Sequence, residues 1–356
     1  MWLLRRGNYP SSSTGLPVVE DSSSDRDIEI ELGKRHWFLI AIYIAAILAA
    51  SVTLHVRLPN PDVANTNYSQ FSELRAKRNV FEMSNFGPKP AGSEACDGLT
   101  KRYILNEIDV IKVAATAKLE VSQQNPSGCL DIPRFDTDGF TVCYKNISNV
   151  VVRLSRPDAA EDSKVAVLLN CHFDSWPTSS GGSDDLLSCA LMLEVMRLLS
   201  RNPQVLSHDV IFLFNGAEES SLQGAHGFIT KHPWRHAVRA FINLEASGSG
   251  GRELLFQAGP SNQWLLNSYL EAAVHPHCSI IGQEIFQSGF FPGDTDFRVF
   301  RDYGRVPGLD LAFVQNGYWW HTEFDEARRI TVGSLQRAGE SERLGISSRD
   351  NAYLLS

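Results

Sequence analysis

The feature that most constrains this chain of 356 residues is an uncharged apolar run near its N-terminus. Residues 37–56 contain no Asp, Glu, Lys or Arg, and about 20 residues at a helical rise of about 1.5 Å match a bilayer core of about 30 Å. A buried globular helix usually keeps a polar face, and a cleaved signal peptide has a shorter apolar run that starts earlier. We therefore predict one transmembrane signal anchor, which makes the lipid bilayer a partner.

Charge and glycosylation motifs predict which side of the membrane the rest of the chain occupies. Three basic residues closely precede the run and two follow it, which favours a cytosolic N-terminus. Asn67 and Asn146 each begin an Asn-x-Ser sequon after the run, so we predict glycosylation at both on a luminal or extracellular side. Disulfides are permitted there, and Cys129 and Cys143, which flank a short turn-rich segment, are the predicted pair.

Composition excludes several classes of protein. The 41 acidic residues exceed the 33 basic ones, which argues against nucleic acid as a partner because phosphate binding needs a basic face. A hydrophobic fraction of 43% supplies a large core, so a disordered chain is excluded. The six cysteines form no Cys-x-x-Cys pair, which argues against a thiol-redox site or a Cys₄ zinc ribbon. The sequence carries no signal of the oligomeric state.

We predict five parts along the chain. A disordered cytosolic tail, the anchor, a polar stem, a folded domain and a polar C-terminal tail are expected at 1–36, 37–56, 57–78, 79–337 and 338–356. Within the folded domain the predicted strands are 150–154, 165–169, 210–214, 240–244, 254–257 and 311–314, and the predicted helices are 184–200, 222–231 and 263–273. This alternation predicts an α/β fold with a mostly parallel central sheet and helices on both faces.

Polar side chains with metal-binding or acid–base chemistry follow several predicted strands. Each group alone has an ordinary explanation, such as a helix cap or a solvated loop. Glu218 and Glu219 are a stronger signal, because adjacent ionised carboxylates repel unless a cation or a shared proton compensates. Open α/β sheets bind ligands at such strand ends, and the groups expected to meet there are His172, Asp184, Glu219, Glu245 and His321.

A set of imidazoles and carboxylates suits zinc. Five ligands serve two metals only if one carboxylate bridges them, as in sites whose metals lie about 3.5–4 Å apart. Neighbouring side chains of an extended backbone diverge, so one of the two adjacent glutamates can bind metal while the other faces a bound water. The sequence therefore predicts two zinc ions per chain.

The chain resembles the aminopeptidase Y-like di-zinc metallopeptidases over about residues 81–339, through the ordered motifs CHFDSW, GGSDD, NGAEES, INLEASGSGG, FFPGDTDFRVF and YWWHTEFD. The resemblance implies a zinc-exopeptidase fold and aminopeptidase activity on peptide or protein substrates. It implies that Asp184 bridges the two zinc ions. His172 and Glu245 would complete one site, and Glu219 and His321 would complete the other.

The same resemblance implies roles for two further residues. Glu218 would be the general base that activates the metal-bound water, and Asp174 would be the carboxylate that orients His172. The resemblance also implies the endoplasmic reticulum membrane, with the peptidase domain in the lumen. Proteins of this kind continue into further membrane spans and a second luminal region, so this sequence resembles a truncated or alternative product.

Two other functions stay open as alternatives. Glutaminyl cyclases are single-zinc acyltransferases of related fold that resemble the chain around Asp184, Glu219 and His321 but lack the first metal histidine. The presence of His172 therefore favours two metals and hydrolysis. A non-catalytic scaffold or receptor homologue would have lost ligands, and this chain keeps all five.

Nucleophilic catalysis is disfavoured, and a substrate pocket is only weakly indicated. The chain has no Gly-x-Ser-x-Gly elbow. Cys171 beside His172 is no usable dyad, because adjacent strand residues point to opposite faces. Tyr318, Trp319 and Trp320 precede the last predicted ligand, and they either wall a hydrophobic pocket for the substrate or pack as ordinary core.

Overall fold

The computed structural model describes residues 33–61, 69–132, 139–159, 165–260, 263–288 and 293–347. Contacts divide the chain into two compact units, Met1–His55 and Val56–Ser356. Helix α1 (Lys34–Val56) has no buried residue, and among the described residues it is the one helix that is long and apolar enough to cross a membrane. The predicted anchor segment is thus helical, whereas most of the predicted cytosolic tail lies outside the described residues.

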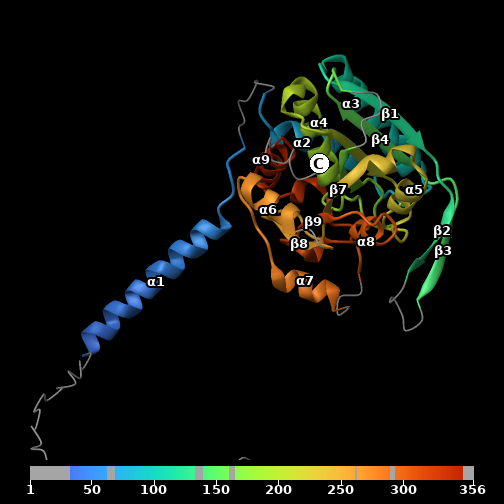
Figure 1. Ribbon diagram of the computed structural model, residues 1–356. Helices are drawn as coiled ribbons and strands as arrows, with labels where there is room; N and C mark the ends of the chain where they lie inside the picture. Colours follow the sequence, from blue (N-terminus) through green and yellow to red (C-terminus); the bar gives the residue numbers. More distant parts are fainter. Residues whose placement is uncertain are drawn as a thin grey trace, which may run out of the picture. The chain divides into compact units, whose positions relative to one another are not determined.

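The second unit is built on a seven-stranded sheet of order β1-β4-β6-β5-β7-β9-β8 (Figure 1). Its strands are β1 (Lys118–Gln124), β4 (Asn149–Ser155), β5 (Ala166–His172), β6 (Asp209–Asn215), β7 (Val238–Ala246), β8 (Glu253–Gly259) and β9 (Gly308–Phe313). The four central strands β6, β5, β7 and β9 run parallel, and β1, β4 and β8 pair antiparallel at the edges. The six predicted strands correspond to β4–β9, which confirms the α/β fold class.

Helices cover both faces of this sheet, as predicted. One face is covered by α2 (Glu73–Ser84), α3 (Lys101–Val113), α4 (Leu186–Arg201), α6 (Gln263–Ala272) and α9 (Ser334–Ser347), and the other by α5 (Gln223–Lys231) and α8 (Asp296–Asp302). Strand side chains alternate between the two cores, so Val150 and Val152 pack in the first and Val151 in the second. The remaining helical elements are α7 (Ile280–Gln287), a π-helical segment at Glu94–Thr100, and short 3₁₀ turns at Pro203–Val205, Pro233–Ala237, Gly317–Trp319 and Ala327–Arg329.

The strand order places a switch point at β5. From β5 the chain passes through α4 to β6 on one side, and from β6 it passes through α5 to β7 on the other side of β5. Ligand sites of open α/β sheets lie at the carboxyl ends of strands where the order reverses in this way. His172 is the last residue of β5 and is paired with Asn215 at the end of β6, so the loops after both strands begin at the same edge of the sheet.

A two-stranded hairpin projects beside this sheet (Figure 1). It consists of β2 (Gly128–Ile132) and β3 (Phe140–Tyr144), which pair antiparallel. Cys129 and Cys143 face each other across the hairpin and form a disulfide, the pair chosen from the sequence. Asn146, which begins one of the two sequons, is exposed just after β3, whereas Asn67 lies outside the described residues.

Two predicted boundaries of the folded domain are wrong. The stem was expected to reach residue 78, but α2 starts at Glu73, and Ala76 is fully buried in the main core. The apolar residues of this helix recur at helical spacing on one face, and its charged face hid that period in the sequence.

The C-terminal boundary is wrong for a similar reason. The tail was expected to begin at residue 338, but α9 runs through this point, and Ala338 is buried in the core. The buried Glu73 carboxylate of α2 accepts backbone hydrogen bonds from Gly333 and Gln336 at 2.9 and 3.0 Å, which caps the N-terminus of α9. Residues 348–356 lie outside the described part of the chain.

Candidate active site

The five predicted metal ligands come from five separate places at the carboxyl edge of the central strands. Two lie within strands, at the end of β5 and near the end of β7, and three lie in the loops that precede α4 and follow β6 and β9. In that order they are His172, Glu245, Asp184, Glu219 and His321. The structure brings all five together.

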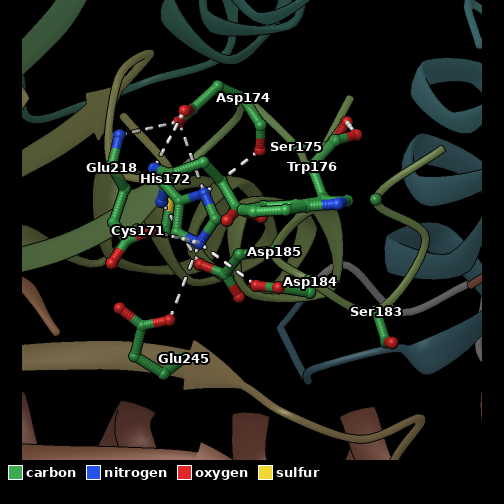
Figure 2. A network of polar contacts seen from close by, with 12 residues as sticks. Cys171, His172, Asp174, Ser175, Trp176, Ser183, Asp184, Asp185, Glu218 and Glu245 are labelled. Atoms are coloured by element: carbon green, nitrogen blue, oxygen red, sulfur yellow. Dashed lines mark hydrogen bonds and ion pairs between the residues drawn. The ribbon is translucent and has the colours of Figure 1, made fainter. Parts of the chain in front are cut away.

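Asp184 lies between the two histidines. Its Oδ1 is 3.2 Å from Nε2 of His172, and its Oδ2 is 3.2 Å from Nε2 of His321. Glu245 Oε2 approaches His172 Nε2 at 3.6 Å (Figure 2), and Glu219 Oε2 approaches His321 Nε2 at 3.1 Å. The five side chains therefore form two groups of three that share Asp184, and within each group the potential ligand atoms lie within 4.8 Å of one another.

The donor atoms of this cluster fit zinc. Nε2 of His172 and Oε1 of Glu219 are buried and make no hydrogen bond within the described part of the chain. Buried polar atoms are nearly always satisfied, so atoms left without a partner at such a place point to an ion or a water. Imidazole nitrogen and carboxylate oxygen are the donors that zinc takes in catalytic sites.

The electrostatics of the cluster also favour a cation. Burial acts to raise the pKa of Asp184, but its hydrogen bonds with His172 and His321 outweigh burial and lower that pKa to about 2. Burial and the charge of Asp184 raise the pKa of Glu219 to about 7. Burial acts to lower the pKa of His321, but its hydrogen bonds with the carboxylates raise it to about 9. The metal-free cluster thus retains protons that a divalent cation would displace.

Glu218 is close to the cluster but belongs to neither group of three. Its Oε2 is 3.9 Å from Nε2 of His172, farther than the nearest oxygens of Asp184 and Glu245. Burial is the main cause that raises its pKa well above the usual range, and the charge of Glu245 acts in the same direction. A carboxyl group with high proton affinity beside a metal cluster is suited to accept and release a proton.

Asp174 contacts both His172 and the segment that carries the two glutamates (Figure 2). Its Oδ1 is 3.4 Å from Nδ1 of His172 and accepts the backbone N–H of Glu218 at 3.0 Å. Its Oδ2 accepts the backbone N–H of Glu219 at 3.1 Å. One fully buried carboxylate thereby orients the ring of one predicted ligand and the backbone of another.

The predicted aromatic pocket residues do not lie together at the cluster. The Trp320 ring stacks on His321 with 3.7 Å between ring centroids, and its Nε1 donates to Oδ2 of Asp184 at 2.7 Å. Trp319 instead packs under the guanidinium of Arg329, and the exposed Tyr318 ring contacts Trp319. Of the three residues, Trp320 is the one with a described contact to the predicted ligands.

Sequence reasoning missed two residues that contact the cluster. The Trp176 ring stacks on His321 with 4.6 Å between centroids, and Asp325 accepts the backbone N–H of Asp184 at 3.1 Å. Both lie within motifs already noted, but no spacing rule marks either one. Cys171 was rejected as a nucleophile, and it is fully buried with its Sγ 2.8 Å from that of Cys189.

Comparison with known families fits this geometry. Residues 149–343 match the model of Peptidase family M28, and the chain belongs to this family. Among curated proteins, the chain is 62% identical over 330 residues to "Putative endoplasmic reticulum metallopeptidase 1-B" of Caenorhabditis elegans, covering 91% of this chain and 37% of that protein. It is 51% identical over 274 residues to "Endoplasmic reticulum metallopeptidase 1" of Homo sapiens, covering 76% of this chain and 30% of that protein.

The chain spans about a third of the length of these curated relatives. The family confirms the predicted class of metallopeptidase, and the names agree with the predicted endoplasmic reticulum location.

Solved structures with the same fold include zinc peptidases and cyclases. The zinc aminopeptidase of Bacillus subtilis superposes with a TM-score of 0.57 at 14% identity, covering 78% of this chain and 95% of that chain. A Zn-dependent exopeptidase of Parabacteroides distasonis gives 0.58 at 17% identity, covering 80% and 100%. The glutaminyl cyclase of Porphyromonas gingivalis gives 0.55 at 17% identity, covering 78% and 98%. The zinc-exopeptidase fold predicted from the sequence is therefore confirmed.

Proposed function

We propose that this chain is a membrane-anchored zinc aminopeptidase that binds two zinc ions. The observation that carries the proposal is the position of Asp184, whose two oxygens face different histidines. His172 and Glu245 would hold one ion, and Glu219 and His321 would hold the other, with Asp184 shared. Each ion would then have three protein ligands, which is the number that a catalytic zinc keeps when one position stays open.

Zinc at these sites would act as a Lewis acid on the substrate carbonyl and would lower the pKa of a bound water to about 7. The proton released during attack needs an acceptor, and the Glu218 carboxylate is the acidic side chain at the cluster that belongs to neither predicted ligand set. Glu218 would take this proton and deliver it to the nitrogen of the leaving amine. Asp174 would keep His172 in the required tautomer by facing its Nδ1.

The charge of the site favours a substrate with a free amino terminus. The carboxylates of Glu218 and Asp174 remain beside the cluster after the ligand sets are counted. Such an environment attracts a substrate ammonium group and repels a substrate carboxylate. Trp320 would line the space for a substrate side chain, with Trp319 and Tyr318 farther from the cluster.

A cyclase function is the alternative that one observation favours. The solved structures that share this fold include a glutaminyl cyclase, with a TM-score close to those of the zinc peptidases. Against this alternative, His172 and Glu245 complete a second group of three around Asp184. A single-zinc acyltransferase would need only the other group.

The proposal places the peptidase domain in the lumen of the endoplasmic reticulum. Helix α1 would cross the bilayer, residues 1–36 would face the cytosol, and the second unit would be luminal. The support is the exposed sequon at Asn146 and the disulfide of the hairpin, both of which require an oxidising, glycosylating compartment.

The decisive experiment measures zinc content and substrate class on the detergent-solubilised full chain. We expect close to two zinc ions per chain, and His172→Ala should remove about one of them. The matched control is His236→Ala, because His236 is exposed and lies outside both ligand groups. Aminoacyl-arylamides should be hydrolysed and their N-acetylated forms should not. One zinc that His172→Ala leaves in place, together with cyclisation of glutaminyl substrates, would establish the cyclase alternative.

A further inference from the structure

Asp325 is a buried carboxylate that holds the loop carrying Asp184. We call residues 175–185, between β5 and α4, the Asp184 loop. Oδ1 of Asp325 accepts the backbone N–H of Ser183 at 2.9 Å and also its hydroxyl. Oδ2 accepts the backbone N–H of Asp184 at 3.1 Å and the hydroxyl of Ser179 at 3.4 Å. With 1% of its surface exposed, Asp325 spends both of its oxygens on this loop.

The backbone around Asp325 is fitted to the same loop. Its carbonyl oxygen accepts the N–H of Gly182 at 3.0 Å and the hydroxyl of Ser180 at 2.7 Å. A Cβ atom on Gly182 would lie 2.4 Å from the backbone nitrogen of Ala327, so this position has no room for a side chain. The two segments therefore lie backbone against backbone at the place where Asp325 binds.

The other end of the Asp184 loop is held independently. The fully buried Lys89 donates from Nζ to the carbonyl oxygens of Gly87 and Ser180, at 2.6 Å each. The backbone N–H of Ser175 also donates to the carbonyl of Lys89 at 3.0 Å. Loss of the Asp325 carboxylate would thus free the end of the loop that carries Asp184 while its beginning stays in place.

Asp325 also belongs to the segment that supplies the last predicted ligand. It follows His321 by four residues, and its backbone N–H donates to the carbonyl of Thr322 at 3.2 Å in the turn between them. One short segment thus presents His321 to the cluster and clamps the loop of Asp184.

We propose that Asp325 is a positioning residue that fixes Asp184 between the two metal sites, so that it controls the metal affinity of both sites together. The inference rests on the proposed two-metal site. A residue that positioned His321 alone would affect one site, and a residue with only a general structural role would affect neither affinity selectively. Partners of metal ligands of this kind typically change metal affinity by about 10- to 100-fold.

The test uses Asp325→Asn, which keeps the size of the side chain. A carboxamide has one acceptor oxygen and turns an NH₂ group toward the other backbone N–H, so one of the bonds to Ser183 and Asp184 is lost. Full-length protein is stripped of metal and titrated with Zn²⁺ alone against a competing chelator. We expect both zinc affinities to fall together by about 10- to 100-fold, whereas His172→Ala abolishes one site.

Asp209→Asn is the matched control. Asp209 is also buried and also binds its partner through its carboxylate, which pairs with Arg153 at 2.5 Å, but it lies at the opposite end of β6 from the cluster. It should lower the unfolding temperature without changing either zinc affinity. If Asp325→Asn does not fold, Ser183→Ala removes one donor to the same carboxylate and should weaken both sites by about 2- to 10-fold, the equivalent of one neutral hydrogen bond.

Three results would overturn the inference: unchanged zinc affinities in Asp325→Asn or in its replacement Ser183→Ala, weakening of one site alone, or an equal change in Asp209→Asn. A wild-type chain that binds only one zinc would contradict the two-metal proposal instead. In that case the Asp325 clamp is still tested, because the single site must weaken in Asp325→Asn if Asp184 is one of its ligands.

Discussion

Replacement of Glu218 and Glu219, one at a time, by glutamine separates proton transfer from metal binding. Glutamine keeps the shape of the side chain and most of its hydrogen bonds, but it cannot accept a proton at any working pH. Glu218 belongs to neither group of three, so its loss leaves six donor contacts to two ions intact. Glu219 supplies one of the three donors of the second group, with its Oε2 3.1 Å from Nε2 of His321.

The expected magnitudes differ accordingly. For Glu218→Gln we expect kcat to fall by about 10²–10⁴-fold, the contribution of a positioned acid–base group, which corresponds to about 2.7–5.4 kcal/mol of activation free energy. Zinc content and KM should stay nearly unchanged. The unfolding temperature should stay equal or rise, because burial disfavours the charged form of Glu218. Glu219→Gln should weaken zinc binding at one site by at least about 100-fold, above the usual effect of a partner outside the ligand set.

The assay combines steady-state hydrolysis of an aminoacyl-arylamide with zinc determination on the same samples. Added zinc should restore part of the activity of Glu219→Gln and none of the activity of Glu218→Gln. Near-normal turnover in Glu218→Gln would refute its role as the base. Loss of zinc from Glu218→Gln but not from Glu219→Gln would show that the two residues have exchanged roles.

Three further outcomes follow from the same geometry. Since the pKa of His321 is raised to about 9 and that of Glu219 to about 7 in the metal-free protein, zinc must displace a proton from His321 below about pH 9 and a second one from Glu219 below about pH 7. The zinc affinity of that site should therefore fall about tenfold per pH unit between pH 9 and 7 and about 100-fold per unit below pH 7; an affinity independent of pH between 6 and 9 would contradict this assignment. Asp174→Asn should lose one of two backbone hydrogen bonds to its carboxylate and lower kcat about 10- to 100-fold, with His172→Ala as a reference for zinc loss; a normal kcat would remove Asp174 from the site. Asn146→Gln should increase gel mobility by the mass of one glycan in expressing cells, and no change after this substitution and glycosidase treatment would remove the main support for a luminal domain.

The buried strands could be predicted from the sequence because burial on both faces leaves a continuous apolar run. β5 and β6 are of this kind, and both were located within two residues of their observed ends. β1 was missed, since this edge strand carries polar residues on a half-exposed surface. The same cause hid α2, whose charged face dominates its composition while Val80 and Met83 are fully buried.

The predicted metal ligands could be located because of a topological regularity. Carboxyl ends of parallel strands meet at one edge of the sheet, so side chains that follow separate strands become neighbours without any local sequence signal between them. Asp325 could not be predicted in this way. Its contact with Asp184 joins residues 141 positions apart through a backbone N–H, and a backbone donor is the same for every residue type. Only the packed loops determine which N–H the carboxylate meets.

The residues that sequence reasoning missed gather on one side of the cluster, and the construction of the two groups explains why. His172 and Glu245 project from the adjacent strands β5 and β7, where the sheet fixes their backbones. Glu219 and His321 project from the loops after β6 and β9, the strands that flank this pair. A loop supplies less precise geometry than a strand and needs contacts from outside itself. Trp176 and Trp320 stack on His321, and Asp325 holds the loop beside it. The second group therefore depends on tertiary contacts for the order that the first group takes from the sheet.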